Sequence, residues 1–176
     1  IDLIEEVARL DGYEKIPVTL PKGPPSPEVG NRLLLLERKT LDVLIHHGYH
    51  EVITYSFTSP TSWDFLGSPA EVSRRAHLRI LNPLTEDFSV MRTSLIPGLL
   101  ETARYNLSRK NSNLKLFELK KVFLPKEGEK LPSEVKYLAG LALGLDRDPH
   151  WAAVTRSVEF WDVKGCVGSV LEGRES

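Results

Sequence analysis

The sequence predicts an α+β domain with a mostly antiparallel sheet, preceded by an N-terminal helical arm. Three observations lead to this fold class. Residues 114–124 and 135–145 have the composition of strands and flank a short polar loop, as in an antiparallel hairpin. Apolar stripes with helical spacing lie before, between and after these strands. A proline-rich stretch, residues 16–30, separates the first helix from the rest and forms a semi-rigid linker.

The composition is that of a globular protein from a reducing compartment. The 176 residues are 41% hydrophobic and 27% charged, with a formal net charge of −1. This balance excludes general disorder and provides no overall field that would attract nucleic acid or an anionic membrane. Cys166 is the single cysteine, so an internal disulfide is excluded. No transmembrane run and no signal peptide is recognised, and the start at Ile1 leads us to expect a piece of a larger protein.

The first helix is predicted over residues 2–10. Asp2, Glu5 and Glu6 share one of its faces, because they are spaced at i, i+3 and i+4. Acidic side chains complement the dipole at a helix start, and Glu5 is placed to pair with Arg9 one turn later. The alternative is a hard-cation site, because Mg²⁺ takes carboxylate oxygens from one or two side chains and keeps several waters. The residues alone leave both interpretations open.

The next part of the chain is predicted to hold a helix, a strand and a helical turn. The helix covers residues 32–47, and its start, residues 33–36, is apolar nearly all round, as at an interface. The strand covers residues 51–58, where Ile53, Tyr55 and Phe57 alternate with polar residues. The following segments are a helical turn that starts at Ser59 and Pro60, a polar loop over residues 67–75 and a strand over residues 77–81.

Residues 81–107 are predicted to form a turn, an extended segment and a helix with Pro97 in its first turn. This order brings Arg92, Thr93 and Ser94 to the junction between the extended segment and the helix. Such a junction suits an anion or a nucleotide, because a helix N-terminus has free N–H groups and partial positive charge. The alternative is a strand–helix corner that binds nothing. Its helix is expected to bury one stripe, made of Leu95, Leu99, Leu100, Ala103 and Leu107.

The C-terminal part is predicted to add a short strand over residues 158–161 and a helix capped by Asp162. The apolar stripe of this helix contains Val163, Val167, Val170 and Leu171.

Other chemistry is sparse. His46, His47 and His50 cluster at a helix end, where the dipole favours histidine, and Cys166 suits a small buried thiol better than a nucleophile. The glycine-rich phosphate motifs and the GxSxG nucleophile motif are absent from the sequence.

Several stretches of the chain, in order, closely resemble the β-subunit family of bacterial phenylalanyl-tRNA synthetase. They are DLIEEVARLDGYEKIP (residues 2–17), HHGYHEVITYSFTSP (46–60), ILNPLTEDFSVMRTSLIPGLLETARYNLSR (80–109), LKLFELKKVFLP (114–125) and the closing FWDVKGCVGSVLEG. The resemblance implies that residues 1–22 are the end of an upstream small helical domain and the start of a linker. Residues 23–176 would be a catalytic-like but non-catalytic class II synthetase core, an antiparallel sheet flanked by helices, without its C-terminal part.

The resemblance also implies particular sites. A Mg²⁺ ion shared with the α subunit would be held by Asp2, Glu5 and Glu6. Residues 32–47 and 51–58 would be the motif 1 element that builds the subunit interface. Motif 2 normally reads Phe-Arg-x-Glu, but this chain has Phe117-Glu118-Leu119, and motif 3 lies outside the chain. An arginine clamp on ATP is therefore not expected here, and ATP would bind to the α subunit.

The implied enzyme is an (αβ)2 heterotetramer of the cytoplasm that attaches phenylalanine to tRNA-Phe with ATP and Mg²⁺, away from any membrane. Within it, the chain is expected to be a scaffold that is inactive alone. Two alternatives are a residual anion or nucleotide site at Arg92 and Ser94, and tRNA contact through Arg104, Arg109 and Lys110. The near-neutral charge argues against a large RNA footprint.

Overall fold

The structure, a computed structural model, describes residues 1–20, 22–23, 31–64, 78–126, 128–129, 131–147, 149–152 and 154–173. The chain forms two compact units, Ile1–Asn31 and Arg32–Ser176. The predicted loop over residues 67–75 and residues 24–30 of the predicted linker lie outside the described residues.

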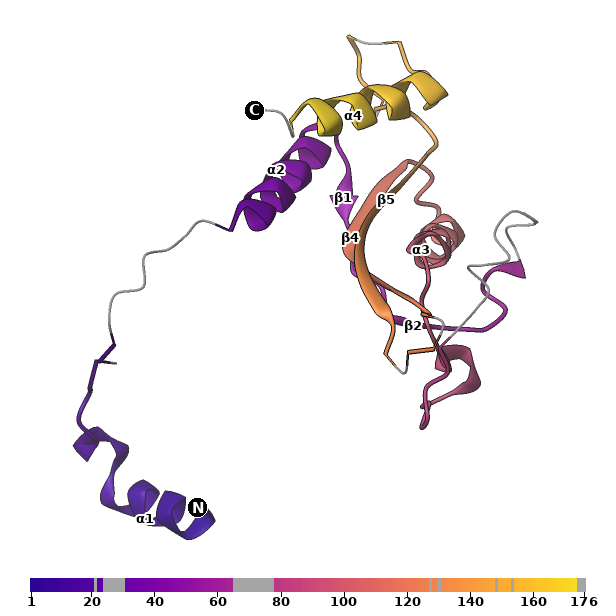
Figure 1. The fold of residues 1–176 in the computed structure, drawn as a ribbon. Helices are drawn as coiled ribbons and strands as arrows, with labels where there is room; N and C mark the ends of the chain where they lie inside the picture. Colours follow the sequence, from indigo (N-terminus) through magenta and orange to yellow (C-terminus); the bar gives the residue numbers. More distant parts are fainter. Residues whose placement is uncertain are drawn as a thin grey trace. The chain divides into compact units, whose positions relative to one another are not determined.

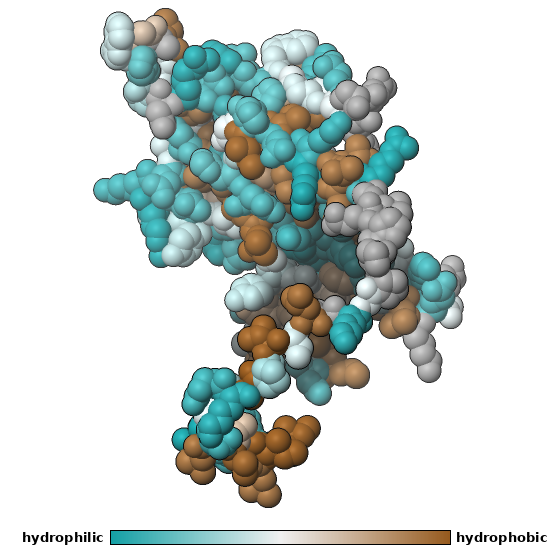
Figure 2. Space-filling model, turned by 90° about the vertical axis from the view of Figure 1, so that its left-hand side faces the viewer, coloured by the Kyte–Doolittle hydropathy of each residue, from teal (hydrophilic) through white to brown (hydrophobic). Residues whose placement is uncertain are grey.

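The first unit contains helix α1 (Asp2–Asp11) and the short 3-10 helix η1 (Tyr13–Lys15). Gly12 separates them with a φ of 101°, a backbone conformation that suits glycine. One side of α1 is apolar and open to solvent, as Figure 2 shows at its lower end. The exposed side chains are Leu3, Ile4, Val7 and Leu10, at 67–83%.

The second unit is built on a three-stranded sheet with the order β1-β4-β5. Strand β4 (Leu114–Leu124) pairs antiparallel with β5 (Ser133–Leu143) along its whole length. Strand β1 (His50–Glu51) adds to β4 in parallel. A separate antiparallel ribbon joins β2 (Phe57–Thr58) to β3 (Val90–Met91), next to the 3-10 helix η4 (Glu86–Phe88). The predicted mixed α+β class and the hairpin are confirmed.

Helices cover both faces of the sheet (Figure 1). Helices α2 (Arg32–His46) and α4 (Phe160–Glu172) contact each other on one face. Helix α3 (Ile96–Ser108) lies on the other face and contacts β4 and β5. The core on the first face contains Leu44, Tyr49, Phe117 and Cys166. Among the described residues, every helix is too short or too polar to cross a bilayer.

The strand predicted over residues 51–58 is wrong in its middle. Only its two ends belong to strands, β1 and β2, whereas residues 52–56 belong to no strand. Ile53 and Tyr55 are each 76% exposed, whereas Thr54 between them is half-buried. The cause is Glu118, which accepts hydrogen bonds from both the N–H and the hydroxyl of Thr54. The polar side of this segment therefore faces inward.

The segment before α4 also differs from its prediction. Ser157 forms an isolated bridge with Leu145, and the chain is already helical from Phe160. The N-cap is Glu159 and not Asp162, because the two residues form a reciprocal capping box in which Asp162 is the third helical residue.

Three smaller predictions are corrected as well. Residues 78–81 form only one isolated bridge, between Arg79 and Val90. Arg9 pairs with Glu6 instead of Glu5; both spacings place neighbours on a helix surface, and exposed pairs are too weak to decide between them. The apolar stripes of α3 and α4 are narrower than predicted, because α3 is covered where it contacts β4 and β5, and α4 where it contacts α2. The exposed members are Leu100, Leu107, Val163, Val167 and Leu171, at 39–54%.

Candidate functional site

Residues 92–94, called the corner below, join β3 to α3 and are tied by their backbone to two other segments. The Arg92 N–H donates to the carbonyl of Ser56, and the Arg92 carbonyl accepts from the N–H of Phe123, both at 2.9 Å. Each of the three corner residues is at most 5% exposed. The sequence prediction that these residues meet at the start of a helix is confirmed.

Arg92 forms a buried ion pair with Glu118 at the corner. Arg92 Nη1 lies 2.8 Å from Glu118 Oε1, and the two side chains are 6% and 0% exposed. Nη1 also donates to Thr54 Oγ1 at 3.0 Å, and Nε donates to the Lys121 carbonyl at 3.0 Å. Thr54 completes the cluster by donating its N–H and its hydroxyl to the two Glu118 oxygens, at 3.2 and 2.7 Å. The guanidinium charge is therefore matched by a carboxylate within the protein.

The other two corner side chains are also engaged internally. Ser94 Oγ accepts from the Ile96 N–H at 3.2 Å, which occupies one of the free donors at the start of α3. Thr93 Oγ1 accepts from the indole N–H of Trp63 at 3.2 Å. Arg92 and Ser94 thus both lie at the corner, but their side chains bond to different partners. An anion site at this position remains a prediction.

Gly98 allows α3 to approach the cluster closely. A Cβ atom at this position would lie 2.7 Å from Thr54 Oγ1, inside van der Waals contact. Thr54 in turn bonds to both members of the ion pair. The first turn of α3 and the ion pair are therefore linked through one threonine.

The carboxylates proposed for a metal lie on α1. Asp2, Glu5 and Glu6 are all exposed, and Glu6 accepts from Arg9 Nη2 at 2.7 Å. Asp2 and Glu5 have no ion-pair partner in the described part of the chain. Two accessible carboxylates fit the oxygen chemistry of Mg²⁺, which needs only one or two protein ligands beside its waters. Within the described residues, no group of three potential metal-binding side chains is assembled.

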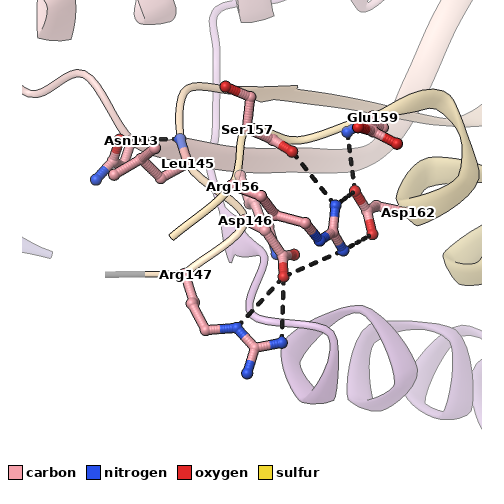
Figure 3. Close-up of polar contacts among 9 residues, drawn as sticks. Asn113, Leu145, Asp146, Arg147, Arg156, Ser157, Glu159 and Asp162 are labelled. Carbon is pink, nitrogen blue, oxygen red and sulfur yellow. Dashed lines mark hydrogen bonds and ion pairs between the residues drawn. The ribbon is translucent and has the colours of Figure 1, made fainter. Parts of the chain in front are cut away.

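A second ionic cluster joins the loop after β5 to the start of α4 (Figure 3). Asp146 contacts Lys115 at 3.1 Å, Arg147 at 3.3 Å and Arg156 at 3.4 Å. The Arg156 guanidinium also donates hydrogen bonds to both carboxylate oxygens of Asp162, and the Glu159 N–H donates to Asp162 at 2.8 Å. The Lys115 hydrogen bond is the main cause that lowers the pKa of Asp146. The Arg156 hydrogen bonds hold the pKa of Asp162 well below its usual range.

The histidines at the end of α2 lie on the surface, whereas the cysteine is part of the core. His46 Nδ1 lies 2.6 Å from the Asp42 carbonyl, and His47 Nε2 lies 3.1 Å from Ser169 Oγ. Cys166 is 3% exposed, and burial raises the pKa of its thiol. The prediction of a small buried thiol is confirmed.

Sequence reasoning missed Glu118 and Arg156. Glu118 lies between Phe117 and Leu119 in a predicted strand, and a carboxylate buried beside such residues needs a partner; that signal could have indicated an ion pair. Arg156 carried no comparable signal, because its partners come from a loop that has no regular spacing.

Comparisons with known proteins agree on one family. The family model described as "Phenylalanyl tRNA synthetase beta chain CLM domain" matches residues 16–175. The "Phenylalanine--tRNA ligase beta subunit" of Geobacter metallireducens is 44% identical over 172 residues, which cover 98% of this chain and 22% of that protein. The protein of the same name from Syntrophus aciditrophicus is 45% identical, over 97% of this chain and 21% of that protein. The chain thus spans about a fifth of the length of the curated relatives it matches.

Solved structures show the fold. A pyrrolysyl-tRNA synthetase from Desulfitobacterium hafniense superposes with a TM-score of 0.57 at 18% identity, over 80% of this chain and 46% of that one. A histidine–tRNA ligase subunit from Alicyclobacillus acidocaldarius gives a TM-score of 0.58 at 14% identity, over 90% of this chain and 44% of that one. At such low identity the likeness concerns the fold alone, which agrees with the synthetase-like core expected from the sequence.

Proposed function

The chain belongs to the phenylalanine–tRNA ligase beta-subunit family, and from this premise we propose that it is a structural part of a ligase that attaches phenylalanine to tRNA-Phe. In this proposal the complete enzyme is an (αβ)2 heterotetramer of the cytoplasm that uses ATP and Mg²⁺. The 176-residue chain supports the assembly and carries no active site of its own. ATP is bound by the alpha subunit.

The observation that carries the proposal is the Arg92–Glu118 pair. A catalytic class II core presents an arginine from motif 2 to the ATP phosphates, whereas this chain has Glu118 in that segment. Glu118 is fully buried and bonded to the corner arginine, so both charges are used to hold β4 against the corner. A buried, matched pair is suited to fixing structure and poorly suited to binding a triphosphate.

The proposed partner surface is the first turn of α2. Leu33, Leu34 and Leu35 are 57%, 50% and 53% exposed, a concentration of leucine that is unusual on a free helix surface. We assign this surface to contact with the alpha subunit, because the beta-subunit names of the relatives imply a partner. Burial of three leucine side chains would stabilise such an interface by several kcal/mol, at roughly 1.5–3 kcal/mol for each fully buried side chain.

The proposed metal ligands are Asp2 and Glu5, with Glu6 beside them. A bound Mg²⁺ would neutralise these carboxylates and could join α1 to oxygen ligands from the partner. The two carboxylates without an ion pair are the better candidates, because Glu6 would have to leave Arg9. By itself α1 offers an incomplete site, so weak binding is expected until the partner adds ligands.

Co-purification with a phenylalanine–tRNA ligase alpha subunit tests the scaffold. The unchanged chain should be retained, and the double variant Leu33→Asp, Leu34→Asp should not. The matched control is Leu107→Asp on α3, where the leucine is 48% exposed and association should persist. Retention of the double variant would remove these leucines from the interface. Phenylalanine-dependent pyrophosphate exchange by the chain alone would contradict the proposed absence of an active site.

A further inference from the structure

We draw no further inference here: the strongest candidate, the cavity between the C-terminal end of α2 and the first turns of α4, is lined by the carboxylates of Asp146 and Asp162 and the ammonium of Lys115, which are already paired within the protein, so nothing in the structure selects the charge or the class of a ligand.

Discussion

Replacement of Glu118 by glutamine tests whether the buried pair holds the second unit together. Glu118→Gln preserves the shape of the side chain but removes its charge, so the Arg92 guanidinium stays buried without a counter-charge. The amide also replaces one acceptor oxygen with a donor, although Thr54 and Arg92 both require acceptors there. The substitution therefore leaves a charge and at least one hydrogen bond unmatched in a site that solvent does not reach.

The magnitude follows from the burial of both partners. Loss of one member of a buried pair costs about 3–5 kcal/mol, and the retained amide oxygen places this variant near the lower end, at about 3 kcal/mol. For a unit of this size, such a loss lowers the midpoint of thermal unfolding by roughly 6–12 °C. Urea unfolding followed by circular dichroism measures the free energy directly, and the slope with urea should stay unchanged.

The control is Glu134→Gln on the neighbouring strand β5. Glu134 also pairs with a cation, Lys121 at 2.8 Å, but these two side chains are 49% and 52% exposed. An exposed pair contributes about 0–1 kcal/mol, so this variant should be nearly neutral. The double variant Arg92→Leu, Glu118→Leu should be less destabilised than Glu118→Gln, because it leaves no unmatched charge. Similar stabilities for Glu118→Gln and Glu134→Gln would refute the argument.

Three further predictions concern other parts of the second unit. Gly98→Ala should destabilise it by about 1–3 kcal/mol in urea unfolding, because the added methyl group displaces Thr54. The control is Gly168→Ala, which should stabilise α4 by up to about 1 kcal/mol, because a Cβ atom there meets open space. Equal effects of the two substitutions would contradict the close approach of α3 to Thr54. The lowered pKa of Asp162 stabilises the fold above the unfolded-state pKa of about 3.9, and this contribution is lost as pH falls from there through the folded-state pKa. Urea midpoints of Asp162→Asn should therefore change less between pH 7 and pH 3 than those of the unchanged chain, and parallel curves would count against the Arg156 contact. Cys166 should react slowly with a thiol reagent in the native state and rapidly in denaturant, since it is buried and its thiol pKa is raised; rapid native labelling would show that α4 opens.

Local patterns predicted the elements whose signals are strong and near in sequence. The β4–β5 hairpin, α1, α2 and α3 appear within a few residues of their predicted bounds, because each has its own periodicity and end signals. The corner was located correctly for the same reason. The segment of residues 52–56 was not, because its alternation suggested a regular strand and said nothing of Glu118, which is more than sixty residues away.

The sequence by itself determined the fold class, the family and the positions of the helices and of the hairpin. These depend on residue spacing and on stretches of sequence that resemble a known family. Only the tertiary structure decided that Arg92 is matched by Glu118, that Ile53 and Tyr55 face solvent, and that Tyr49 and Lys115 line one cavity. The physical reason is that a buried charge takes whichever partner the packing supplies, and the packing joins strands and helices whose separation in sequence carries no local signal.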